Sequence, residues 1–256
     1  MLAGIRMDAV RGTPLYQKFV ANRSLPALDD FARESGFDPR RDVRELLIAS
    51  NGKSAIIAAR GAFSEQSVKG SAKQSYAGAR IYTLDPGAVA LIDETTAVAG
   101  ALPDVKAALD RRQTGGHAGS DGLLARARRI PRENQVWSVA TNFDNLLISR
   151  IPQAENAAGL LQSLESTTLA LDLSDGIHGY LSGNCSSDEE AKSLGDSARG
   201  LIALARLGVP GKQRELLRLW DGIKVDQQQR TVKITVEVPE DLAEKLLDWL
   251  GPRVRN

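Results

Sequence analysis

The sequence predicts an α+β fold made of two structurally similar halves, each with the β-α-β-β-α-β order of a ferredoxin-like sandwich and an antiparallel sheet. Two hairpin signals carry this prediction: Asn51-Gly52, and Asp175-Gly176 placed 124 positions later. The helix-start pairs Ser64-Glu65 and Asp188-Glu189 are separated by the same 124 positions. Since turns and helix starts recur in one order, the halves are expected to share one pattern.

In the first half, alternating apolar residues predict the strands, and proline or a capping residue predicts each helix start. We expect strands at 2–10, 43–49, 54–60, 79–84, 88–93 and 95–99. We expect helices after Thr13-Pro14 and at 26–35, 65–73 and 104–112. Gly36 is expected to end the second of these helices, because glycine adopts the left-handed conformation readily.

The second half repeats these signals, with one extra helix at 212–220. Strands are expected at 136–143, 167–173, 177–181, 223–225 and 230–238, and helices at 152–164, 188–207 and 239–249. The strand 230–238 carries a continuous apolar side (Val232, Ile234, Val236 and Val238). We therefore expect the sheets of the two halves to pack together.

A Gly-rich polar stretch, TGGHAGSDG at 114–122, is the best candidate for a linker. The expected organisation is a first α+β repeat at 1–113, a linker with a short basic helix at 114–134, and a second repeat at 135–256.

Charge and composition exclude several kinds of partner. The 256 residues carry 33 basic and 32 acidic side chains, for a formal net charge of +1. This balance provides no general field for nucleic acid, and an aromatic content of 5% does not suit a base-stacking module. No apolar run approaches the roughly 20 residues of a membrane span. We expect neither a nucleic-acid partner nor a membrane span, and the oligomeric state stays open.

Metal and cofactor sites are not expected, because the chain has one cysteine, Cys185, and two histidines, His117 and His178. Neither phosphate-binding glycine motif is present, and Asn51-Gly52-Lys53-Ser54 is interpreted as a hairpin turn. Cys185 precedes a helix start, where a thiol can become reactive, but a passive buried side chain is favoured.

No catalytic residues are predicted. His117, Ser120 and Asp121 lie together in the linker, where a triad geometry is difficult to build. The carboxylate pairs Asp188-Glu189 and Glu240-Asp241 are interpreted as helix caps.

One candidate partner-binding patch consists of Arg126, Arg128, Arg129 and Arg132 in the sequence RARRIPR. It could contact an acidic partner or a polyanion. The alternative is the solvated face of a short helix, with Leu123, Leu124 and Ala127 behind it.

The segment 31–61 carries a Gly-Phe-Asp-Pro-x-x-Asp step before a hairpin, followed by Ala-x-Arg-Gly-x-Phe at 58–63. With 93–100 (DETTAVAG) and 105–112 (VKAALDRR), it resembles a set of uncharacterised, mostly acidobacterial proteins. The resemblance implies an exported α+β protein and names no activity. It agrees with reading Met1 as a start left after removal of a secretion signal. A cytosolic start is the alternative.

These observations favour a non-enzymatic binding or structural protein of the bacterial cell envelope or periplasm, with an unknown protein or small molecule as its partner. Two alternatives stay open. One is a hydrolase-type enzyme whose site forms only in three dimensions, and the other is a cytosolic protein-interaction module.

Overall fold

The computed structural model describes residues 1–21, 23–65, 68–69, 72–85, 87–115, 121–141, 163–209 and 214–250. The chain divides into two compact units. Unit 1 comprises Met1–Gly12 and Tyr16–Arg129, and unit 2 comprises Thr13–Leu15 and Ile130–Asn256. The division of the sequence at 1–113, 114–134 and 135–256 stays a prediction.

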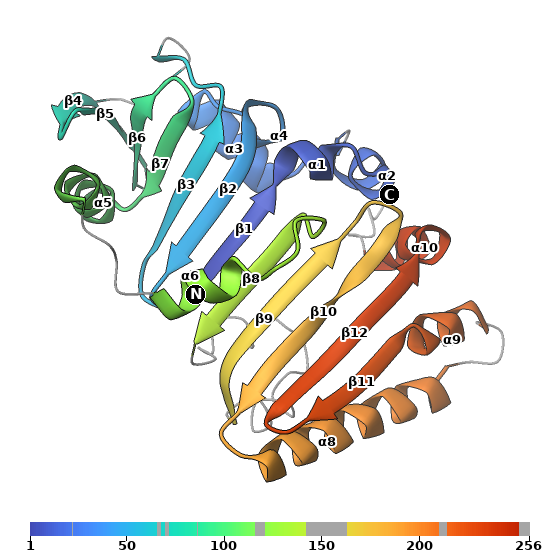
Figure 1. The fold of residues 1–256 in the computed structure, drawn as a ribbon. Coiled ribbons are helices and arrows are strands. Elements are labelled where there is room, and N and C mark those ends of the chain that lie inside the picture. Colours follow the sequence, from blue (N-terminus) through green and yellow to red (C-terminus); the bar gives the residue numbers. More distant parts are fainter. Residues whose placement is uncertain are drawn as a thin grey trace. The chain divides into compact units, whose positions relative to one another are not determined.

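Unit 1 contains an antiparallel sheet (Figure 1). Its described strands are β1 (Leu2–Arg6), β2 (Val43–Ser50), β3 (Ala55–Gly61), β4 (Ala72–Tyr76), β5 (Ala79–Leu84), β6 (Gly87–Asp93) and β7 (Thr96–Gly100). They are ordered β1-β2-β3-β7-β6-β5-β4, and each neighbouring pair is antiparallel. Within the described residues, β4 is therefore the last strand at its end of this series.

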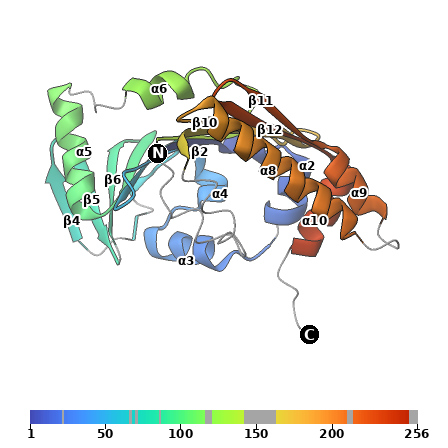
Figure 2. The same ribbon diagram turned by 90° about the horizontal axis from the view of Figure 1, so that it is seen from below.

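Helices cover both faces of this sheet. The helices in this part of the chain are α1 (Met7–Arg11), α2 (Pro14–Tyr16), the π-helical turn η1 (Gln17–Ala21), α3 (Pro26–Ser35), α4 (Pro39–Asp42), α5 (Leu102–Thr114) and α6 (Asp121–Ala127). Of these, Pro14 and Leu15 of α2 belong to unit 2. On one face, Val105 and Leu109 of α5 pack against small residues of β5, β6 and β7. On the other face, Phe37, between α3 and α4, packs with Phe63, Val89 and Leu91. Figure 2 shows α5 and the α3–α4 pair on different sides of these strands.

Unit 2 also contains an antiparallel sheet. Its described strands are β8 (Val136–Thr141), β9 (Leu164–Asp172), β10 (Gly176–Cys185), β11 (Ile223–Gln228) and β12 (Thr231–Pro239). Its helices are α8 (Asp188–Leu207), α9 (Arg214–Asp221) and α10 (Glu240–Leu250). Helix α8 packs on β10, β11 and β12, where Ala191 and Leu194 contact Val232, and α10 packs on β10 and β12.

The two units share a pattern of strand pairing. In each, the first strand pairs with the second, the second with the third, the third with the last, and the last with the strand before it. In a ferredoxin-like half, the two strands that a helix joins are parallel to each other and are separated by a third strand that lies antiparallel between them. In unit 1, β1 and β2 are joined through helices but are direct antiparallel neighbours. The ferredoxin-like arrangement is therefore not confirmed, whereas the α+β class with antiparallel sheets is.

The apolar side of 230–238 is covered partly by helices of its own unit. Val232 and Val238 are buried, and Ile234 and Val236 between them are half-buried. Helix α8 covers the Val232 end, and α10 packs on the same strand. A second sheet is therefore not needed to bury the ends of this strand.

Several local predictions are confirmed. Helix α3 runs from Pro26 to Ser35, and Gly36 ends it with a φ of 82°. The hairpin of β2 and β3 turns at Asn51-Gly52, where the Asn51 side chain accepts hydrogen bonds from the backbone of Lys53 and Ser54. The helix predicted at 188–207 is α8, although Ser187 is its cap, accepting a hydrogen bond from the Glu190 backbone.

The helix predicted at 65–73 is wrong. Residues 62–64 and 68–69 are extended or irregular, and Ala72–Tyr76 forms strand β4. The opening strand is also shorter than predicted, since it ends at Arg6 and α1 follows. The helix predicted at 152–164 falls almost entirely outside the described residues. In the described part of the chain, none of the helices has the length and apolar character needed to cross a bilayer.

Candidate ligand pocket in unit 1

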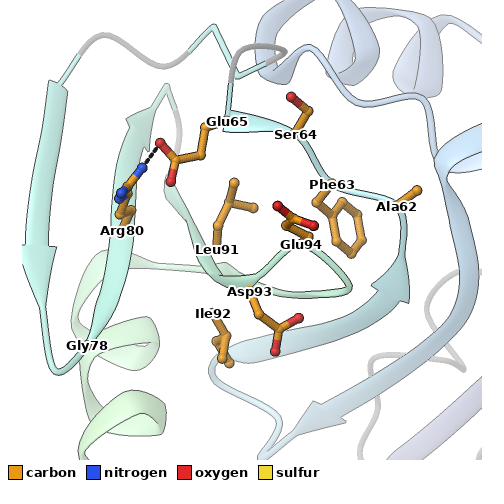
Figure 3. A pocket seen from close by; sticks show the side chains of 10 residues that line it. All are labelled: Ala62, Phe63, Ser64, Glu65, Gly78, Arg80, Leu91, Ile92, Asp93 and Glu94. Carbon is orange, nitrogen blue, oxygen red and sulfur yellow. Dashed lines mark ion pairs between the residues drawn. The ribbon is translucent and has the colours of Figure 1, made fainter.

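A pocket of about 770 Å³ opens on unit 1, where strands β5 and β6 meet the segment that follows β3 (Figure 3). Its lining combines apolar and charged residues: Ala62, Phe63, Ser64, Glu65, Gly78, Arg80, Leu91, Ile92, Asp93 and Glu94. Phe63 and Leu91 are buried and belong to the core, while Asp93 and Glu94 are exposed. The pocket therefore has an apolar floor and a charged rim.

The segment after β3 is held in place by backbone hydrogen bonds. The amides of Gly61 and Phe63 donate to the carbonyl oxygens of Thr95 (3.0 Å) and Glu94 (2.8 Å). Between them, the amide of Ala62 donates to the carbonyl oxygen of Asp42 (2.9 Å). These bonds fix one wall of the pocket against the turn between β6 and β7.

Arg80 and Glu65 form an ion pair in the pocket wall (Figure 3). Arg80 is opposite Leu91 in the register of β5 and β6, so the two side chains lie on one face of the sheet. Glu65 reaches Arg80 from the segment after β3. Both side chains are partly exposed, at 51% and 37%, so the pair contributes little stability by itself.

Asp93 ends β6, and Glu94 and Thr95 form the turn to β7. One Asp93 carboxylate oxygen accepts hydrogen bonds from the Thr95 hydroxyl (2.7 Å) and the Thr95 amide (2.8 Å). These bonds lower the pKa of Asp93 below its usual range. Figure 3 shows the Glu94 side chain beside Phe63 and near Leu91.

The predicted arginine patch does not contribute to this pocket. Arg126 is half-buried near the end of α6, whereas Arg128, Arg129 and Arg132 are exposed. No ion pair between described residues involves these four side chains. Their role in binding a partner stays a prediction.

Cys185 lies in the core of unit 2. Its side chain is buried against Leu164, Ala191 and Val232, and burial raises the pKa of its thiol. A buried thiol with a raised pKa is a poor nucleophile, which agrees with the passive role favoured from the sequence. His178 lies on β10, and its Nε2 is 3.1 Å from a carboxylate oxygen of Asp175, which precedes this strand.

Sequence reasoning missed the charged pocket residues. Glu65 had the pattern of a helix start, and Arg80 had no distinguishing signal in its strand. Asp93 and Glu94 belong to the segment 93–100 that carries the family resemblance, but nothing in the sequence brings them close to Phe63 and Leu91. The pocket depends on the pairing of β5, β6 and β7, which local patterns do not specify.

A second exposed feature lies on α8. Leu201, Leu204 and Leu207 are 55%, 66% and 83% exposed. Arg206 lies between two of them and pairs with Asp221 of α9. The spacing places the three leucines close together on one side of the helix.

Comparison with known proteins shows the fold alone. No protein-family model and no curated protein matches the chain. Crystal form III of TP0453 matches with a TM-score of 0.56 and 10% sequence identity, over 96% of this chain and 93% of that chain. Crystal forms I and IV match with TM-scores of 0.54 and 0.55, both at 11% identity, over 97% and 96% of this chain and 91% of each TP0453 chain.

Proposed function

We propose that this chain is a non-enzymatic binding protein of the bacterial cell envelope, and that its ligand occupies the unit 1 pocket. The observation that carries the proposal is the pocket itself, about 770 Å³ in volume, with Phe63 and Leu91 in its floor and ionised groups at its rim. Ligand sites typically combine an apolar cavity with a few polar groups that orient the ligand.

The lining residues favour binding over hydrolysis. Among the lining residues that the structure describes, Ser64 carries a hydroxyl group and there is no histidine, cysteine or lysine. Asp93 is a poor general base, because hydrogen bonds from Thr95 lower its pKa and a base works best with a pKa near the working pH. These charged and apolar residues of the described lining support a binding role.

The envelope location is supported by the resemblance of 31–61 and 93–112 to proteins that carry secretion signals. We also propose that the two units are related copies, in agreement with their shared pairing pattern. In that relation, the hairpin of β6 and β7 corresponds to that of β11 and β12, and the β4–β5 hairpin is an addition to unit 1.

A fragment screen followed by amide NMR of the full chain tests the binding function. We expect some fragments to shift the amides of Phe63, Arg80 and Glu94 in a saturable way. Ala62→Phe places a ring at the pocket mouth and should abolish these shifts. Ala203→Phe is the matched control, because Ala203 is an exposed alanine on α8. Loss of shifts in both variants, or in neither, would contradict the pocket as the binding site.

A further inference from the structure

The charges that line the pocket do not balance. Among the lining residues that the structure describes, Glu65, Asp93 and Glu94 contribute three carboxylates and Arg80 contributes one guanidinium. Since Arg80 is already paired with Glu65, its charge is not directed at Asp93 and Glu94. The rim formed by the turn between β6 and β7 is therefore negative.

Glu94 carries part of this negative charge and lies next to apolar residues of the pocket. The amide of Phe63 donates to the Glu94 carbonyl oxygen at 2.8 Å, which holds the two residues side by side. In Figure 3 the Glu94 side chain lies beside the Phe63 ring, with Leu91 near it in the floor. A carboxylate next to an apolar surface matches a positively charged group that carries an apolar body, since the carboxylate attracts the cation and the apolar surface accepts the body.

From this arrangement, and resting on the proposed binding function, we infer that the pocket takes an organic cation, an ammonium or guanidinium group attached to an apolar body. The cation lies near the Glu94 carboxylate, and the apolar body covers Phe63 and Leu91. Asp93 adds a second negative charge, and the hydrogen bonds from Thr95 keep it ionised. An anion of the same shape meets the negative rim and is disfavoured.

The test uses three probes with the same ring and chain length but different charge: phenethylamine, 2-phenylethanol and phenylacetate. Each is titrated into the full chain at neutral pH and followed by the amide shifts of Phe63, Arg80 and Glu94. We expect phenethylamine to bind about tenfold more tightly than 2-phenylethanol, and phenylacetate to bind most weakly. Added salt should reduce this difference.

Glu94→Gln removes the charge while keeping the size of the side chain. It should reduce the affinity for phenethylamine about tenfold and leave that for 2-phenylethanol unchanged. Glu189→Gln, at an exposed position in α8, is the control and should change neither affinity.

The outcomes separate the two proposals. Binding of 2-phenylethanol or phenylacetate in the pocket with an affinity equal to that of phenethylamine would overturn the cation inference and leave the binding function standing. An unchanged affinity for phenethylamine in Glu94→Gln would likewise overturn the cation inference and leave the binding function standing. If fragments from the screen bind elsewhere and none of the three probes shifts the pocket amides, both proposals are wrong.

Discussion

Gly61 lies directly against the carbonyl oxygen of Asp42. A Cβ added at Gly61 would lie 2.0 Å from that oxygen and 3.0 Å from the Phe63 ring. Since the oxygen belongs to the backbone and accepts the Ala62 amide, it has little freedom to move away. This contact sets the course of the chain from β3 into the pocket wall.

We predict that Gly61→Ala lowers the free energy of unfolding by about 1–3 kcal/mol, because the added methyl group forces the backbone apart. Denaturant unfolding measures this change. Gly200→Ala is the control, since a Cβ there meets nothing within 4 Å in helix α8 and should raise stability by up to about 1 kcal/mol. Equal effects of the two substitutions would contradict the close contact at Gly61.

In the turn between β4 and β5, a substitution at Ala77 is expected to stabilise the protein. Ala77 and Gly78 have φ values of 49° and 76°, so both are left-handed, as in a type I′ turn. Asparagine tolerates this conformation better than alanine, and Ala77→Asn should raise the free energy of unfolding by about 0.5–1 kcal/mol. Ala77→Val should have the opposite effect, because a β-branched residue is strained at positive φ. A destabilised Ala77→Asn variant would argue against this turn.

The hydrogen bonds to Asp172 make the free energy of unfolding depend on pH in the acidic range. Burial raises its pKa, but hydrogen bonds from the Ser174 hydroxyl (2.7 Å) and the Gln135 amide (2.8 Å) outweigh this, and the pKa is lowered overall. The stabilisation is therefore complete above the unfolded pKa of about 3.9 and is lost as the pH falls from there through the folded pKa. Asp172→Asn should make unfolding less dependent on pH below about 4. Asp226→Asn, at an exposed position of β11, is the comparison; an equal change in both variants would contradict the role of these hydrogen bonds.

Two leucines with different burial should differ strongly in their contribution to stability. Leu109, on the buried side of α5, is 1% exposed, whereas Leu204, on α8, is 66% exposed. Leu109→Ala should cost about 2–5 kcal/mol, and Leu204→Ala should change stability by no more than about 0.5 kcal/mol. Thermal and denaturant unfolding of the two variants measure these changes in stability. A large loss at Leu204 would mean that its side chain is covered in solution.

Local chemistry made much of the fold predictable. Gly36 ends α3, and Asn51-Gly52 forms a hairpin turn, because these residue types accept the required backbone conformations. Strand β4 was missed because its sequence, AKQSY, has little β propensity. It forms by pairing with β5, a tertiary effect that outweighs local preference.

The pocket was not predictable for a related reason. Glu65 follows a serine and precedes polar residues, so its pattern indicated a helix start, and its partner Arg80 lies in a strand beyond β4. The strand order also could not be derived, since the hairpins themselves do not specify which strand pairs with β3. Helix and strand positions follow from local periodicity, whereas the site depends on long-range pairing.

Intermolecular NOEs between phenethylamine and the protein test the central claim most directly. We expect NOEs from the probe's ring protons to the Leu91 methyl groups and the Phe63 ring, and we expect these NOEs to disappear in Ala62→Phe. NOEs confined to the exposed leucines of α8, with none to Leu91 or Phe63, would contradict the assignment of the unit 1 pocket as the binding site.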